Sequence, residues 1–272
     1  MEIRLLQLKK MRNARDLGGI PAMDGKVIRP GKLIRSGRLF RLPEQTKRAL
    51  SEMGVTTVVD FRIPCEIEEH PESLPEGVKY RNLPFFTAPD DHFVPEATMR
   101  AIAKREGKRI GRQFANIDAY IIACYAKIVW GAEGQAKLRE FLKIAAKQRG
   151  CLLFHCNSGK DRTGIAAMLL ESLLGVSEED ILTDYMASRR FLRGLYTRYR
   201  VGIAVVPARM RTKRMVLGLL RIKKKYLQII MDSIKEEYGT IEDYCRIVLE
   251  MTDEEISAMR KKYLIDPKKI SG

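Results

Sequence analysis

Two adjoining stretches, CLLF at residues 151–154 and HCNSGKDRTG at residues 155–164, decide the fold. Four apolar residues in succession predict a short buried strand. The apolar segment from Thr163 to Leu174, which Gly175 closes, predicts a helix directly after the loop. A glycine-bearing loop between a strand and a helix is typical of α/β proteins with a mostly parallel central sheet flanked by helices. We therefore expect that class.

Other stretches on the amino-terminal side extend this pattern. The run VTTVVDF at residues 55–61 predicts a second buried strand, and a helix from Pro43 to Met53 precedes it, with Gly54 at its C-terminal cap. A weaker strand is predicted at residues 80–86. The dipeptide Asp24-Gly25, which lies between apolar residues, predicts a hairpin turn near the amino terminus.

The rest of the chain is predicted to be mostly helical. Residues 112–148 repeat apolar side chains at helical spacing, and Gly131 and Gly134 divide them into two helices. Ser177, which three acidic residues follow, predicts the start of another helix. The carboxy-terminal part is helical as well, and its last helix opens with a capping box, TDEE, at residues 252–255.

Length, composition and charge narrow the class of protein. The chain has 272 residues, 45% of them hydrophobic, which suits one generous domain spanning residues 1–272. It carries 50 Lys and Arg residues against 34 Asp and Glu residues, a formal charge of +16. Thirteen of the basic residues and none of the acidic ones fall within residues 186–231. Such a charge favours a polyanionic partner: a nucleic acid, an anionic membrane or a phosphorylated substrate.

The cysteines and the amino terminus bear on the compartment. Five cysteines, with no CxxC pair, fit neither a disulfide framework nor a zinc ribbon, so we expect a reducing compartment. The opening MEIRLLQLKK has no apolar signal-peptide core, and no apolar stretch approaches the roughly 18 residues of a membrane span. These features predict a cytoplasmic protein, and leave secretion without a cleavable leader open.

Residues 155–164 admit two chemical interpretations. A nucleotide-binding loop, GxxxxGK followed by Ser or Thr, needs that hydroxyl to hold magnesium and an earlier glycine. Here Asp161 follows Lys160, and no glycine lies at the earlier position. The sequence therefore does not favour a nucleotide triphosphatase.

The second interpretation is a nucleophilic cysteine, Cys156, with an arginine six positions later, Arg162. A loop of this length can turn successive N–H groups inward around an anion, and the following helix adds positive potential at the same point. Arg162 would grip a phosphate with two parallel hydrogen bonds. The same field favours the thiolate form of Cys156, the attacking species in phosphoryl transfer.

The other loop residues have predicted roles around the phosphate. We expect Thr163 to hydrogen-bond the thiolate, and Gly159 and Gly164 to let the loop turn and the helix pack closely. The residues predicted to bind substrate are therefore Asn157, Ser158, Gly159, Lys160, Thr163 and Gly164.

HCNSGKDRTG resembles the HCxxGxxR signature of the cysteine-dependent phosphatases, and its GKDRTG form is similar to the bacterial tyrosine and dual-specificity phosphatases, some of which also act on phosphoinositides. Further motifs resemble that group along most of the chain. They are NARDLGG at 13–19, PG at 30–31 with IRSG at 34–37, VVDFR at 58–62 with Glu66, DY at 184–185 with Ser188, and YG at 238–239 with TDEEI at 252–256. The resemblance implies the tyrosine-phosphatase fold.

The resemblance also implies a two-step hydrolysis that uses no metal or other cofactor. Cys156 attacks phosphorus, Arg162 stabilises the transition state, and water then hydrolyses the thiophosphate. A general acid must protonate the leaving oxygen. Tyrosine phosphatases commonly take it from a separate loop, where Asp90 or Asp91 is available. Asp161 inside the signature loop is the other candidate, and we favour it because similar enzymes have an aspartate there.

Four residues are expected to support this site. His155 is expected to orient the loop through hydrogen bonds and to help hold the thiolate. Lys160 is expected to add a second cation beside the phosphate, which suits acidic or lipid substrates, unless it faces solvent. Arg62 and Glu66 are expected to brace the site, with a surface ion pair as the alternative. Arg15 and Asp16 in the first motif have predicted structural roles.

In the similar bacterial enzymes, the region after the catalytic helix forms a helical lid, so we expect residues 186–231 to be a basic helical lid or insertion. This lid is expected to recruit an anionic surface, such as a phosphoinositide-bearing membrane. The predicted contacts are Arg209, Arg211, Lys213, Arg214, Arg221, Lys223, Lys224 and Lys225. Nucleic acid is not favoured as a partner, because the chain carries no recognisable nucleic-acid-binding motif. The predicted substrate is a phosphoprotein or a phosphoinositide, and the alternative function is a non-catalytic phosphate-binding module.

Overall fold

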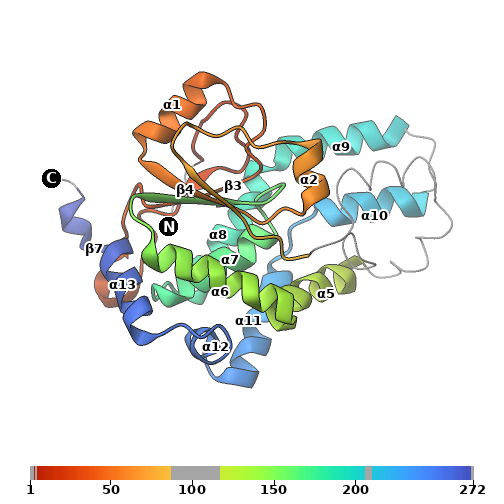
Figure 1. Cartoon of the computed structure of the whole chain (residues 1–272). Coiled ribbons are helices and arrows are strands. Elements are labelled where there is room, and N and C mark those ends of the chain that lie inside the picture. Colours follow the sequence, from red (N-terminus) through yellow and green to blue (C-terminus); the bar gives the residue numbers. More distant parts are fainter. Residues whose placement is uncertain (1–2, 4, 87–116, 206–209, 271–272) are drawn as a thin grey trace.

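A computed structural model describes residues 3, 5–86, 117–205 and 210–270 of the chain. Its centre is a five-stranded sheet with the strand order β1-β3-β6-β4-β5 (Figure 1). The strands are β1 (Arg15–Asp16), β3 (Leu33–Ser36), β4 (Val55–Asp60), β5 (Lys79–Asn82) and β6 (Cys151–His155). All neighbouring pairs are parallel except β1 and β3. The predicted α/β class is confirmed.

The central strand β6 positions the signature loop. All five of its residues are buried, because it lies between β3 and β4 and is covered on both faces. At its carboxyl end, His155 pairs with Ser36 of β3 and Asp60 of β4. The carboxyl ends of three parallel strands therefore meet where the loop leaves the sheet, which is the usual place for a site in α/β proteins.

Helices cover both faces of the sheet. They are α1 (Glu44–Glu52), α2 (Pro64–Glu69), α5 (Ile117–Trp130), α6 (Ala132–Lys147), α7 (Arg162–Leu173), α8 (Glu178–Phe191), α9 (Arg193–Val205), α10 (Met210–Leu220), α11 (Lys224–Tyr238), α12 (Ile241–Ile247) and α13 (Asp253–Tyr263). Gly131 separates α5 from α6 as predicted, whereas Gly134 lies inside α6. There its missing side chain lets the backbone of Ile128 approach, since a Cβ would lie 2.2 Å from the Ile128 oxygen. The predicted caps are also present, at Ser177 for α8 and at Thr252 and Glu255 for α13.

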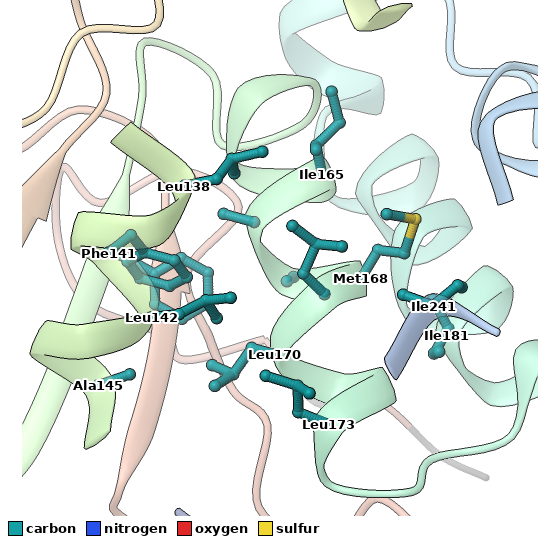
Figure 2. Packing of buried hydrophobic residues seen from close by; sticks show 14 of the residues in the cluster. Leu138, Phe141, Leu142, Ala145, Ile165, Met168, Leu170, Leu173, Ile181 and Ile241 are labelled. Atoms are coloured by element: carbon teal, nitrogen blue, oxygen red, sulfur yellow. The ribbon is translucent and has the colours of Figure 1, made fainter. Parts of the chain in front are cut away.

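The larger of two apolar clusters surrounds α7, the helix that follows the signature loop. Figure 2 shows α7 in the middle of this cluster, with side chains of α6 on one side and of α8 and α12 on the other. Nearly every residue of α7 is buried, so the helix has no polar face. A smaller cluster, which includes Leu50 of α1 and Val58 of β4, packs the opposite face of the sheet. Because α7 is enclosed on all sides, its first turn is held rigidly against the loop.

A second, two-stranded sheet joins a segment near the amino terminus to one near the carboxy terminus. Strand β2 (Val27–Ile28) pairs antiparallel with β7 (Leu264–Ile265), and a short 3₁₀ segment, Pro267–Lys269, follows. The predicted hairpin turn at Asp24-Gly25 is confirmed: Asp24 and Gly25 have positive φ angles of 55° and 66° within the 3₁₀ turn Met23–Gly25, and the Ala22 N–H donates to the Lys26 carbonyl at 2.8 Å.

The predicted strand at residues 80–86 is placed differently. It begins one residue earlier and ends at Asn82. Pro84 has no N–H to donate to a ladder, and Leu83, Phe85 and Phe86 are buried in the main cluster instead. Among the described residues, no helix is long and apolar enough to cross a bilayer.

Candidate active site

Cys156 lies at one wall of a cavity of about 130 Å³ at the carboxyl end of β6. Its side chain is almost fully enclosed, with 2% exposed. The signature loop supplies one wall, and apolar side chains of α5, α9 and α10 supply much of the rest. The lining residues are Glu66, Phe86, Tyr120, Ile121, Cys124, Tyr125, Ile128, Cys156, Asn157, Ser158, Lys160, Asp161, Arg162, Leu195, Leu219 and Leu220. The predicted nucleophile, arginine and acid therefore line the same cavity.

The backbone of the loop is held from outside by the amino-terminal part of the chain. Asn13 Nδ2 donates to the carbonyls of Ser158 and Gly159 at 3.1 and 2.9 Å, and Arg35 Nη2 donates to Gly159 at 3.1 Å. The Arg38 N–H donates to the Asn157 carbonyl at 3.1 Å. In a planar trans peptide the next N–H points the opposite way. The N–H groups of residues 158–160 therefore face away from these donors, as an anion-binding loop requires.

Both loop glycines have the packing reasons predicted for them. Gly159 has a φ of +69°, and a Cβ there would lie 2.2 Å from the Ser36 carbonyl oxygen. At Gly164, a Cβ would lie 3.0 Å from the Tyr185 ring. Gly159 therefore lets the loop approach β3, and Gly164 lets α7 approach α8 closely.

Arg162 is fixed by a bidentate ion pair with Glu66. Its Nη1 and Nη2 donate to the two carboxylate oxygens at 2.6 and 2.9 Å, and Nη1 also reaches the Phe61 carbonyl at 3.1 Å. Burial would lower the pKa of Arg162, but the Glu66 carboxylate outweighs it and raises the pKa well above the usual value. Both residues are buried, so the predicted bracing role of Glu66 has a structural basis and the surface alternative is wrong for it.

Asp161, which precedes α7, is held by two neighbours. Tyr125 Oη donates to Asp161 Oδ1 at 2.6 Å and lies 2.9 Å from Tyr185 Oη. Lys160 Nζ lies 2.9 Å from Asp161 Oδ2 and also donates to the Leu219 carbonyl at 2.8 Å. The Asp161 side chain keeps 31% of its surface exposed. Asp161 is thus oriented and still accessible from the cavity.

For Lys160 the solvent-facing alternative is wrong, while its predicted role as a second cation beside the phosphate stays a prediction, because it lines the cavity with Cys156. It does not face solvent, because only 6% of the residue is exposed. Its ammonium group pairs with Asp161 and binds the end of α10, so it connects the loop to that helix.

His155 is buried behind the loop in a cluster of charged residues. Its Nδ1 lies 3.2 Å from the Cys156 carbonyl oxygen and 3.7 Å from Asp60 Oδ1, and its Nε2 lies 3.5 Å from Glu72 Oε2. Burial alone would lower the pKa of His155, but Asp60 and Glu72 raise it to about 9. The imidazole is therefore a cation at neutral pH that donates toward the loop, in agreement with its predicted orienting role.

Arg62 belongs to this same cluster and does not lie on the surface. It donates to both oxygens of Asp60 at 2.9 to 3.1 Å, and it is also paired with Glu72. Asp60, Glu72 and His155 are residue types that can bind a metal, and their ligand atoms lie within 4.8 Å of one another. In this structure the Arg62 guanidinium and the protonated His155 imidazole lie beside the Asp60 and Glu72 carboxylates. These two groups supply the positive charge that a metal ion would otherwise bring.

Two predictions about the loop are wrong or untested. Thr163 Oγ1 is buried and has no hydrogen-bond partner among the described residues, so the predicted bond to the Cys156 sulfur is not formed. Thr163 lies in the buried first turn of α7 and is not among the residues that line the cavity. Asp90 and Asp91, the alternative acids, lie outside the described residues.

The amino-terminal motifs and the DYxxS motif come together under the loop. Arg15 Nε donates to Asp184 Oδ1 at 2.6 Å, Arg15 Nη2 donates to Ser188 Oγ at 3.0 Å, and Arg35 pairs with the other Asp184 oxygen. Glu171 is buried beside them, and burial together with Asp184 raises its pKa well above the usual value. The predicted structural role of Arg15 is thereby explained. That of Asp16 is too, because it accepts hydrogen bonds from the N–H groups of Gly18 and Gly31.

The sequence interpretation missed Tyr125 and Glu72 as parts of the site. Tyr125 stands in a helical run of apolar residues, where it is indistinguishable from a core position. Glu72 lies in an irregular segment after α2 that carries no motif. Asn13 and Arg35 belong to the two amino-terminal motifs that carry the family resemblance, and that membership is the signal that could have indicated a role for them in the site.

The sequence profile of the tyrosine phosphatase family matches residues 6–265. The chain belongs to the tyrosine phosphatase family. A candidate tyrosine-protein phosphatase of Cupriavidus necator is 32% identical over 263 residues, which cover 95% of this chain and 88% of that protein. The triple specificity protein phosphatase PtpB of Mycobacterium tuberculosis is 27% identical over 238 residues, 80% of this chain and 86% of PtpB.

A tyrosine-protein phosphatase of Nostoc commune is also similar, with 31% identity over 158 residues, 57% of this chain and 47% of that protein. These similarities confirm the resemblance predicted from the signature loop and from the motifs around it. As a member of the tyrosine phosphatase family, the chain is a phosphatase and thus a hydrolase.

Proposed function

We propose that this phosphatase hydrolyses phosphate monoesters through a cysteinyl-phosphate intermediate at Cys156. The Cys156 sulfur attacks phosphorus, the bond from phosphorus to the leaving oxygen breaks, and that oxygen takes a proton from Asp161. Water then attacks the thiophosphate and gives a proton to the Asp161 carboxylate, the bond from sulfur to phosphorus breaks, and inorganic phosphate leaves, which restores the thiolate and the acid. The observation that carries the proposal is that Cys156, Asp161 and a rigidly held Arg162 line one cavity.

Arg162 and the loop amides suit the charge that develops during this reaction. Glu66 holds the guanidinium in place through both of its carboxylate oxygens, so little reorganisation is needed when substrate binds. Donors that are already aimed at the developing charge in an enclosed site contribute most to this kind of catalysis. The carbonyls of the loop are taken up by Asn13, Arg35 and Arg38, which supports a role for the N–H groups in binding phosphate oxygens.

Asp161 is the general acid in this proposal. Its carboxyl group lines the cavity together with Cys156 and is oriented by Tyr125. Asp161 Oδ1 also accepts a hydrogen bond from Lys160 Nζ at 3.2 Å. This arrangement supports Asp161 as the acid.

We further propose phosphotyrosine proteins, phosphoinositides or both as substrates. The cavity walls opposite the loop are aromatic and aliphatic, with Tyr120, Ile121 and Leu219 among them, which suits the ring of phosphotyrosine. The basic residues of segment 186–231 suit a more highly charged substrate. PtpB, a similar protein, carries a name that assigns it three specificities, which supports a broad choice.

The test is steady-state hydrolysis of a phosphotyrosine peptide and of a phosphatidylinositol phosphate, side by side in the presence of a chelator. Cys156→Ser and Asp161→Asn are the variants, and each is checked for folding by its thermal transition. We expect chelator-resistant turnover that Cys156→Ser abolishes. Rapid acid quenching followed by mass spectrometry should find phosphate on Cys156, at higher occupancy in Asp161→Asn if dephosphorylation is slowed.

Two results would contradict the proposal. Turnover that persists in folded Cys156→Ser would mean that another group is the nucleophile. No turnover of either substrate by folded, reduced protein, with phosphate still bound, would instead indicate a non-catalytic phosphate-binding module. The ratio of the two rates in the wild-type protein decides between the substrate classes.

A further inference from the structure

Helices α9 and α10 pack against each other and form a hairpin beside α5 (Figure 1). Lys213 of α10 donates to the Ala204 carbonyl of α9 at 2.8 Å, which fixes the start of α10 against the end of α9. We call the part formed by residues 198–205 and 210–214 the outer end of the hairpin. This outer end combines positive charge with exposed aliphatic side chains.

The aliphatic side chains of the outer end are unusually exposed. Val201, Val205 and Met210 are 62%, 82% and 63% exposed. Among the described residues, only one other large apolar side chain, Ile247, is more than half exposed. Scattered single cases are normal on a protein surface, but three at one place indicate a binding surface.

Helical spacing puts these side chains beside arginines. Arg198, Val201 and Val205 follow one another at intervals of three and four residues, so they share the outward face of α9. Ile203 is buried on the other face. On α10, Met210 and Arg214 are four residues apart and both exposed. Arginines thus flank the aliphatic side chains on both helices.

The structure narrows the basic surface that the sequence predicted. Lys223 and Lys225 pair with Asp118 at 2.7 and 2.5 Å, and these hydrogen bonds hold the pKa of Asp118 far below its usual range. The single Asp118 carboxylate therefore compensates one of their two charges. Arg198, Arg200 and Arg214 are exposed and have no acidic partner within the part of the chain that the structure describes. Arg209 and the side chain of Arg211 lie outside that part.

The inner part of the same hairpin forms the wall of the active-site cavity. Leu195 of α9 and Leu219 of α10 line it, and Lys160 of the loop binds the Leu219 carbonyl. Ten residues of helix separate Leu195 from Val205, which corresponds to about 15 Å along the axis. A partner that binds to the outer end of the hairpin would therefore lie close to the active-site cavity.

We propose that the outer end of the α9–α10 hairpin docks on an anionic lipid bilayer, with Val201, Val205 and Met210 entering the headgroup region and Arg198, Arg200 and Arg214 contacting lipid phosphates. A bilayer uses both features, because aliphatic burial and attraction of Lys and Arg to anionic lipid add together. A nucleic acid or an acidic peptide would use the charges and leave the protruding valines in water. The surface is a binding site in its own right, so its test does not depend on the proposed catalytic mechanism.

The probe is a set of vesicles of phosphatidylcholine with and without phosphatidylserine, free of phosphoinositide so that the cavity recognises no headgroup. Binding is measured by flotation at low and at high salt. We expect the wild-type protein to bind only the vesicles with phosphatidylserine, and less at high salt. Reversing the three arginines to Glu should weaken binding about a hundredfold or more, since each basic residue contributes about fivefold. Val201→Ser with Val205→Ser and Met210→Ser should weaken it at unchanged charge.

Matched variants separate this surface from general charge. Lys261→Glu with Lys268→Glu and Lys269→Glu makes the same charge change on an exposed surface elsewhere, and Ile247→Ser removes the other large apolar side chain that is more than half exposed among the described residues. Both should bind as the wild-type protein does. All variants should hydrolyse a small soluble aryl phosphate at the wild-type rate, or, if none is turned over, show wild-type thermal transitions. In a Trp130→Phe background, which removes the single tryptophan, Val205→Trp should shift its fluorescence to the blue on binding.

The proposal is overturned if the wild-type protein ignores phosphatidylserine, or if the outer-end variants bind as well as the controls do. It is also overturned if the serine variant keeps full affinity while the tryptophan stays in water. If the outer-end variants lose activity toward an acidic phosphopeptide but still bind vesicles, the surface serves protein substrates instead.

Discussion

Tyr125 is a positioning residue for the proposed acid. Its phenol donates to Asp161 at 2.6 Å, and burial together with Asp161 raises the pKa of Tyr125 well above its usual value, so the hydroxyl stays a donor. We predict that Tyr125→Phe lowers hydrolysis of a phosphotyrosine peptide, whose leaving oxygen needs a proton, about tenfold. Hydrolysis of p-nitrophenyl phosphate, whose leaving group needs no proton, should change little. Equal losses on both substrates would contradict this role, and Tyr185→Phe, one hydroxyl further away, should have the smaller effect.

His155 predicts a pH dependence of stability. Its pKa is 6.5 when unperturbed and about 9 in the folded protein, because Asp60 and Glu72 outweigh burial. The folded state therefore binds the proton more tightly, and the stabilisation is fully present below pH 6.5 and lost as pH rises through 9. The loss is on the order of 3 kcal/mol. Urea unfolding at several pH values should show it, and His155→Gln should flatten the dependence. If the unfolding free energy of His155→Gln falls with pH as steeply as that of the wild-type protein, His155 is not the group responsible.

The residues that sequence alone could identify are those whose roles are local. Cys156, Arg162 and Gly159 act through a loop of ten residues, and their spacing carries the information. The role of Lys160 could not be predicted, since its partner is a carbonyl 59 positions away whose placement depends on how α10 packs. Tyr125 was hidden for a similar reason, because an apolar helix face and a buried hydrogen-bond donor look alike in a sequence.

The signature loop as an element depends on the close approach of Gly159 to β3. We predict that Gly159→Ala abolishes activity and destabilises the protein by more than about 2 kcal/mol, because the Cβ would overlap the Ser36 carbonyl at a positive φ. Gly202→Ala is the matched control. It lies inside α9 with open space around it, so the same change should be neutral or stabilise by up to about 1 kcal/mol. Chemical denaturation of both variants gives their unfolding free energies. A Gly159→Ala protein that keeps its activity would contradict the prediction.

Elements were predicted well where a run of residues has its own period, and less well where pairing is non-local. Strands β4 and β6 follow from their apolar runs. Strands β2 and β7 have two residues each and pair across most of the chain, so neither carries a pattern of its own. Strand β5 alternates between half-buried and exposed residues at the edge of the sheet. The predicted strand extends to residue 86 because apolar residues follow β5, but β5 ends at Asn82.

The whole molecule is closed by the pairing of β2 with β7. A chain that stops after Tyr263 should lose the buried Leu264 and its ladder to β2, at a cost of about 2–4 kcal/mol in unfolding free energy. A chain that stops after Ile265 keeps both and should lose less than about 0.5 kcal/mol. Equal stability of the two truncated chains would show that the pairing contributes nothing. Urea denaturation gives both values.

The buried network under the loop has a consequence for how the protein meets its ligand. Arg15 and Arg35 share the single ionised carboxylate of Asp184, since Glu171 keeps its proton. The other buried cations of the site have their own counterions: Arg162 has Glu66, and Arg62 and His155 have Asp60 and Glu72. One positive charge is therefore left over among these side chains, and the proposed Cys156 thiolate supplies its countercharge. In the proposed cysteinyl-phosphate the sulfur is no longer anionic, so the bound phosphoryl group takes over as the counterion for as long as it stays attached.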